Sequence, residues 1–163
     1  MSKMEVKIDA NDVQNELGIR GIDYDPHGNP NSIRAIELAE REGLDVKFPA
    51  DNELFIDIDN EHSFKLFQNQ FYIVKHYIGV VKTKAYPYDY VVTPSRHGLP
   101  GRHIVVTLSR NVTELERIAL QACLGSDRVR EVLGFVQMQN GDPHPTLFLE
   151  AKAPEQKLLT EGV

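Results

Sequence analysis

The sequence predicts an α+β fold in which helices pack on a mixed or antiparallel sheet. Strand-like segments, rich in β-branched and aromatic residues, alternate with helical ones in no regular βαβ order, and two strands follow each other with only a loop between them. The length of 163 residues suits a single hydrophobic core. We therefore expect one domain over 1–163.

Composition and charge restrict the class of protein. The chain has 41% apolar and 26% charged residues, a composition typical of globular proteins, and no apolar run approaches the length of a membrane span. The N-terminal segment has no stretch typical of a signal peptide, and the single Cys123 cannot form an internal disulfide. We expect a cytoplasmic protein with no membrane partner. The net charge of −6 argues against bulk binding of nucleic acid, so any such contact has to be local.

The first elements are a loop and a helix. Residues 23–32 are rich in Pro, Gly, Asn and Asp, which is typical of a surface loop. Ser32 can cap the helix that follows, and Gly43 stands where that helix should end. Helical spacing places its apolar face at Ile33, Ile36 and Ala39.

A strand and a second helix come next. Residues 52–59 are rich in Phe and Ile and alternate weakly, which predicts a strand. The helix after it has an apolar face formed by Phe64, Phe67, Phe71 and Val74. Aromatic side chains at this spacing pack in a core more often than they stack on bases.

The second half of the chain predicts two strands, two helices and a last strand. Strands over 86–93 and 102–108 flank the loop PSRHGLPG and are expected to pair. Thr113 and Glu116 form a capping box at the start of a helix that ends near Gly125. The apolar face of that helix is expected to carry Leu115, Ile118, Ala119 and Ala122.

The C-terminal part continues this alternation. A further helix is expected over 127–135, and a short strand over 146–150 ends in an acidic residue. The polar tail 153–163 is expected to fray.

The segment FIDID places Asp57 and Asp59 in an apolar strand. Residues two apart in a strand project to the same side, so the two carboxylates can converge on divalent cations such as Mg²⁺ or Mn²⁺. Two like charges on a partly buried face also raise each other's pKa, which a cation relieves. The alternative is that this face of the strand contacts water. Glu61 and His62 follow nearby, where the solvated start of a helix explains them.

The loop between the two later strands carries the other candidate groups. Its glycines, including Gly101, allow backbone N–H groups to approach an anion, and Arg96 and Arg102 supply charge that suits phosphate. His103 can donate to a phosphate oxygen or can be a half-buried strand residue. His97 is most simply an exposed loop residue.

An acidic strand, a helix, and then a strand, a Ser and Gly loop and a Gly-x-His strand resemble the archaeo-eukaryotic primase superfamily, including the small primase-polymerases of phages and plasmids. The resemblance covers about 50–110, within a primase-like core over about 45–152. It implies that Asp57 and Asp59 bind metal. The family's Ser-x-His motif would correspond to Ser95, Gly101 and His103, although the loop is longer here and Pro100 stands where a basic residue is expected.

The resemblance also implies an RRM-like sheet and nucleotidyl transfer in DNA replication. Asp57, Asp59 and a third carboxylate would be catalytic. The preferred third residue is Glu150, and Asp127, which can also be a helix N-cap, is the reserve. Ser95, Arg96, Gly101, Arg102 and His103 would bind the phosphates. The expected partners are a nucleoside triphosphate, a single-stranded or primed template, and a helicase or other replication protein.

Two other functions remain open. Glu150-Ala151-Lys152 is an E-x-K at a strand end, which resembles half of a metal-dependent nuclease signature. Alternatively, the chain is a non-catalytic acidic module that docks on a replication protein, or a primase-like core without turnover. The sequence decides neither between these functions nor between ribonucleotides and deoxyribonucleotides.

Overall fold

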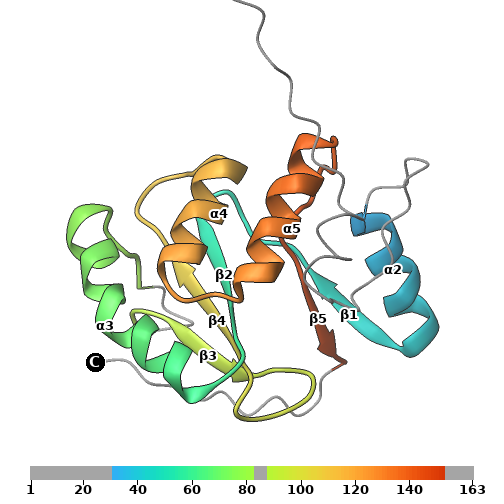
Figure 1. The fold of residues 1–163 in the computed structure, drawn as a ribbon, viewed down its shortest axis with the longest axis horizontal. Helices are drawn as coiled ribbons and strands as arrows, with labels where there is room; N and C mark the ends of the chain where they lie inside the picture. The colour runs from blue at the N-terminus through green and yellow to red at the C-terminus, as the bar shows by residue number, and fades with distance from the viewer. Residues whose placement is uncertain (1–30, 83–87, 153–163) are drawn as a thin grey trace, which may run out of the picture.

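The computed structural model describes residues 31–82 and 88–152, and it confirms the α+β fold (Figure 1). The elements in chain order are α2 (Asn31–Glu42), β1 (Leu44–Lys47), β2 (Glu53–Ile58), α3 (Glu61–Tyr77), β3 (Val91–Pro94), β4 (Arg102–Thr107), α4 (Glu114–Cys123), α5 (Arg128–Gln139) and β5 (Phe148–Ala151). No helix in these two ranges is long and apolar enough to cross a membrane. The expectations for 23–30, for 86–87 and for the tail 153–163 lie outside the described residues.

The strands form two small antiparallel sheets, one of three strands and one of two. In the larger sheet β4 lies between β2 and β3, so the two strands predicted on either side of the PSRHGLPG loop do pair. The register places Asp57 of β2 directly opposite His103 of β4. The acidic strand and the histidine strand are therefore neighbours.

The helix α3 covers one face of the three-stranded sheet. All four residues predicted for its apolar face are buried, and they meet Leu54, Ile56 and Ile58, the alternate residues of β2. This cluster is the main hydrophobic core of the described chain. Its buried members are Leu54, Ile56, Ile58, Phe64, Phe67, Phe71, Val74, Val92, Ile104, Val106, Leu108 and Leu124.

The helices α4 and α5 close the free edge of β2. An edge strand leaves backbone N–H and C=O groups unpaired, and here side chains pair with them. The Phe55 N–H donates to Gln121 Oε1 at 2.8 Å, the Asp57 N–H donates to Ser126 Oγ at 3.0 Å, and Arg130 donates to Phe55 O at 2.8 Å. These contacts dock both helices against the strand that carries the aspartates.

The helix α4 begins at the predicted capping box, but its buried face differs from the prediction. Thr113 and Glu116 make both reciprocal hydrogen bonds. Ile118 is buried as expected, whereas Leu115 is 52% exposed and the buried positions beside Ile118 are polar, Arg117 and Gln121. Apolar spacing gave the wrong face because this helix packs against backbone groups that need polar partners.

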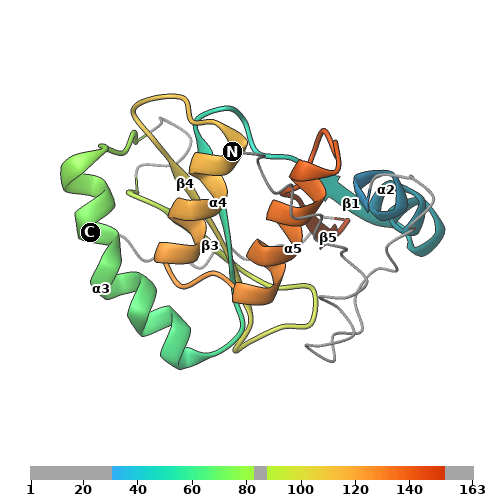
Figure 2. The same cartoon turned by 45° about the horizontal axis from the view of Figure 1, so that its top comes forward.

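The smaller sheet pairs β1 with β5, and α2 packs against β1. The strand β1 was not predicted. The predicted face of α2 is confirmed at Ala39, which is buried, but it is wrong at Ile33 and Ile36, which are exposed, while Ser32 and Ala35 are buried instead. Ser32 lies inside the helix, where its hydroxyl and N–H both donate to the Asp142 carboxylate. Figures 1 and 2 show α5 between α4 and this smaller sheet.

Candidate metal and phosphate site

A cavity of about 360 Å³ lies where β2, β4, α5 and β5 meet. Its acidic lining residues are Asp57, Asp59 and Asp127. Its basic or hydroxyl-bearing lining residues are Ser95, Arg96, His97, His103 and Arg130. The two sequence segments singled out for metal and for phosphate therefore line one cavity, although about forty residues separate them in the chain.

The three aspartates can hold a metal ion. Each offers a carboxylate oxygen, and these oxygens lie within 4.8 Å of one another. The backbone explains the arrangement, because the Asp127 N–H donates to Asp57 O at 2.8 Å and so ties the start of α5 to the end of β2. Asp127 is also the N-cap of α5, and its Oδ1 accepts from the Val129 N–H at 3.0 Å. Asp127 is therefore the helix N-cap that the sequence allowed, and it also belongs to this group of three carboxylates.

The crowding of these carboxylates affects their protonation. Partial burial, together with the nearby charges of Asp127 and Asp57, raises the pKa of Asp59 to about 6, and the Arg130 guanidinium opposes this rise. The repulsion among the carboxylates adds to the effect of burial. A divalent cation between them would remove this repulsion.

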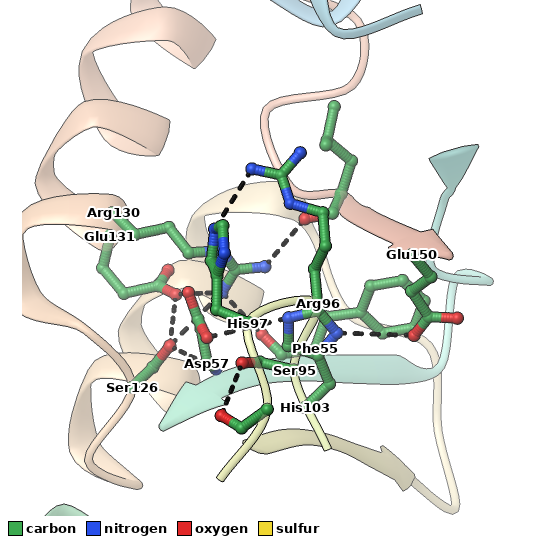
Figure 3. Close-up of polar contacts among 12 residues, drawn as sticks. Phe55, Asp57, Ser95, Arg96, His97, His103, Ser126, Arg130, Glu131 and Glu150 are labelled. Carbon is green, nitrogen blue, oxygen red and sulfur yellow. Dashed lines mark hydrogen bonds and ion pairs between the residues drawn. The ribbon is translucent and has the colours of Figure 1, made fainter. Parts of the chain in front are cut away.

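The buried carboxylate of Glu131 holds the side chains that position the β2 end of the acidic group. Glu131 is 4% exposed, and burial raises its pKa even though three donors act in the opposite direction. Glu131 accepts from Gln121 Nε2 at 3.0 Å. It also accepts from Ser126 Oγ and from Arg130, each at 2.8 Å (Figure 3). The same three side chains bind the edge of β2, so Glu131 fixes the strand end that carries Asp57.

His103 lies on the same face of the sheet as the aspartates. Its Nε2 is 3.8 Å from Asp57 Oδ1, and its Nδ1 is 3.4 Å from Glu150 Oε1 (Figure 3). The ring stacks on Phe148 of β5 with 3.9 Å between centroids. At 7% exposure, His103 is both the buried strand residue and the cavity residue that the sequence allowed.

Glu150, the preferred third carboxylate, does not join the aspartates. Its carboxylate pairs with Lys47 on β1 and contacts His103. Burial alone would raise its pKa, but the hydrogen bonds with His103 and Lys47 outweigh burial and lower the pKa to about 2. The reserve, Asp127, occupies the third position because the α4–α5 loop docks on β2, a contact that no local pattern predicts.

The loop PSRHGLPG, called the glycine loop below, is held by hydrogen bonds between its own backbone groups. The Gly98 N–H donates to Ser95 O at 2.8 Å and the Gly101 N–H donates to Gly98 O at 3.1 Å, so neither N–H points at an anion. Gly101 is required for packing, because a Cβ there would lie 2.5 Å from Ser95 Oγ. Gly101 does not line the cavity, and the predicted use of its N–H for phosphate is not supported.

The two loop arginines lie in different places. Arg96 lines the cavity, contacts His97 Nε2 at 3.3 Å and lies 3.8 Å from Glu42. Arg102 projects to the α3 side, where its guanidinium lies 4.2 Å from the Phe64 ring centroid and pairs with Glu61 at 2.8 Å. Its predicted phosphate role does not agree with this position, since Arg102 and His103 are successive residues of a strand and face opposite ways.

Several lining residues of the cavity were missed, among them Arg130 and Phe148. Arg130 lies on α5 beside Asp127, and it contacts Phe55 O, Leu147 O and the Phe148 ring. Phe148 stacks on both His103 and Phe55. One usable signal was present in the sequence, because Asp127 at the helix N-cap and Arg130 are three residues apart and so lie on the same side of the helix.

Comparisons of the chain with protein-family models, with curated proteins and with solved structures found no match. The primase resemblance therefore depends on the motifs alone, and the function has to be argued from the cavity.

Proposed function

We propose that this protein is a small primase-polymerase-like protein that binds a nucleoside triphosphate together with Mg²⁺ or Mn²⁺. It would transfer the nucleotidyl group to a 3′ hydroxyl of a nucleic acid and release pyrophosphate. One observation carries the proposal: three carboxylates whose oxygens lie within 4.8 Å of one another share a cavity with His103, Arg96 and Arg130. Carboxylate oxygens are the ligands that hard divalent cations prefer. Imidazole and guanidinium groups suit the phosphates that such cations accompany.

The aspartates would bind the metal, and His103 and Arg96 would bind the phosphates. Asp57, Asp59 and Asp127 would hold the metal, which supplies charge neutralisation at the reacting phosphate when it is bound. His103 Nδ1 faces Glu150, which orients the ring and leaves Nε2 on the side of Asp57. A triphosphate at this position would meet Nε2 and the Arg96 guanidinium. A template strand and a helicase or other replication protein would be the macromolecular partners.

The nuclease alternative has less support. Its signature needs the carboxylate of Glu150 and the ammonium of Lys152 beside the metal-binding aspartates. Glu150 instead pairs with Lys47 and His103 and is not among the residues that line the acidic cavity. Nucleotidyl transfer needs no E-x-K, so the geometry favours it.

The first test is metal binding followed by nucleotide incorporation. At a Mn²⁺ concentration of about 100 times Kd, we expect stabilisation of wild type by about 2.7 kcal/mol, measured by thermal unfolding. Asp57→Asn should lose most of this stabilisation and all metal-dependent incorporation on a primed template. Asp45→Asn, an exposed residue of β1, is the matched control and should behave as wild type.

The contrary result is equally clear. If Mn²⁺ and Mg²⁺ leave the unfolding temperature of wild type unchanged, the aspartates are surface charges, and the chain is better explained as a non-catalytic acidic binding module. If metal binds through Asp57 but labelled nucleotide is not incorporated, the metal site is supported and the proposed nucleotidyl transfer fails.

A further inference from the structure

The cavity that holds the three aspartates extends along α5 into an apolar arm. We define this arm by Ala35 of α2, Leu133 and Gln137 of α5, and Pro145 and Leu147 of the segment before β5. The whole cavity, at about 360 Å³, falls in the size range of small-molecule sites, which begins at roughly 300 Å³. If a metal ion and phosphate groups occupy the acidic end, another part of the ligand can occupy this arm.

The helix α5 shows how the two ends are related. Arg130, Leu133 and Gln137 are three and four residues apart, so they lie on one stripe of the helix, and all three line the cavity. With a rise of 1.5 Å per residue, Gln137 lies roughly 15 Å beyond Asp127 along the helix axis. Along this stripe, the Arg130 guanidinium lies nearest the aspartates, Leu133 follows, and the Gln137 amide lies farthest from them. Figure 1 shows this helix alongside the smaller sheet.

Gln137 is the unusual residue of the arm. It is 6% exposed, yet its side-chain amide forms no hydrogen bond with any residue in the described ranges. The amide therefore remains free to hydrogen-bond to whatever occupies the cavity that Gln137 lines, whether solvent or a ligand. The amide offers two donors and one acceptor oxygen, and it therefore matches a ligand edge that carries a donor beside an acceptor.

We propose that the apolar arm holds the base of the bound nucleotide and that the Gln137 amide hydrogen-bonds to the edge of that base. This inference rests on the proposed function for the phosphate end of the ligand. A nucleobase has the required edge, because each presents neighbouring donor and acceptor atoms, and its flat apolar faces suit the walls formed by Leu133, Pro145 and Leu147. Along α5, Arg130 lies between Asp127 at the acidic end of the cavity and Leu133 of the arm.

The test compares a full ligand with its phosphate part alone. Dissociation constants are measured with Mn²⁺ for the four ribonucleoside and four deoxyribonucleoside triphosphates, and for inorganic tripolyphosphate as the probe without sugar and base. We expect Gln137→Leu to weaken triphosphate binding roughly tenfold for the preferred base and to leave tripolyphosphate binding unchanged. Gln139→Leu, an exposed residue of the same helix, is the control and should change neither constant.

A second variant protects the test against a folding defect. Leu133→Trp narrows the arm without removing a polar group, and it should reduce nucleotide binding while tripolyphosphate binding persists. Thermal unfolding confirms that each variant is folded. If Gln137→Leu binds every nucleotide as tightly as wild type, the amide does not contact the base and the inference is overturned.

A third measurement separates this inference from the proposed function. Nucleosides, which lack phosphate, are titrated into metal-free protein while the side-chain amide resonance of Gln137 is followed by NMR. A shift of that resonance supports the arm as a base site even if Mn²⁺ and tripolyphosphate fail to bind, in which case only the proposed function fails. If tripolyphosphate binds with Mn²⁺ but neither nucleosides nor triphosphates gain anything from the arm, the inference alone fails.

Discussion

The two faces of β2 show how one strand serves both a core and a site. On one face, Leu54, Ile56 and Ile58 are fully buried against the aromatic side chains of α3. On the other face, Phe55 is followed by Asp57, which lines the cavity and whose side chain is 26% exposed. The first face is dry and apolar, and the second changes from apolar to acidic toward the end of the strand.

This contrast explains the segment FIDID. A strand exposes alternate residues to opposite sides, so the isoleucines can be buried while the aspartates share the other side. The carboxylates are accommodated because the face opposite α3 opens into a cavity and because α4 and α5 supply polar partners to the strand edge. The apolar face holds the fold together, and the acidic face is available for a ligand.

The largest expected effect tests the apolar face. Phe67 on α3 is completely buried, so Phe67→Ala should lower the free energy of unfolding by about 3–5 kcal/mol, measured by urea denaturation. Tyr72→Ala, on the same helix at 66% exposure, is the control and should change stability by about 0.5 kcal/mol or less. Equal effects of the two changes would mean that α3 does not form the core.

A smaller effect tests the polar face through pH. Because the pKa of Glu150 is lowered from 4.5 to about 2 in the folded state, its ionised form stabilises the protein above pH 4.5, and this stability is lost as the pH falls from 4.5 toward 2. The shift corresponds to about 3.5 kcal/mol at most, given roughly 1.4 kcal/mol per pKa unit, and screening by solvent reduces this figure. Glu150→Gln should flatten the stability curve in this range. A wild-type curve that is already flat between pH 4.5 and 2 would contradict the ion pair of Glu150 with Lys47.

Local signals predicted the framework of this fold well. The phenylalanine spacing of α3, the capping box of α4 and the paired strands around the glycine loop all depend on neighbours in sequence, and all three appear in the structure. The face of α4 was wrong for a tertiary reason, because Gln121 is buried to serve the backbone of Phe55. The strand β1 was missed because its residues, Leu44–Lys47, alternate in burial but carry two charges.

The candidate site was predictable only in part. Alternation allowed Asp57 and Asp59 to share a face, and the register confirms that His103 lies opposite Asp57. The choice between Glu150 and Asp127 could not be made from spacing, because it depends on a hydrogen bond between Asp127 N and Asp57 O across seventy residues of chain. Such a contact follows from how two helices dock, not from any periodicity.

The smallest effect separates the two loop arginines. Arg102 stacks on Phe64 and pairs with Glu61 on the α3 side, so Arg102→Ala should cost about 1 kcal/mol of stability and leave nucleotide affinity unchanged. Arg96 lines the acidic cavity, so Arg96→Ala should weaken Mn²⁺-dependent triphosphate binding with little change in stability. Urea denaturation and dissociation constants on the two variants measure both quantities. The opposite outcome, a loss of affinity on changing Arg102, would place the phosphates on the α3 side of β4, away from the aspartates. The apolar face of the sheet would then contribute to ligand binding as well as to the core.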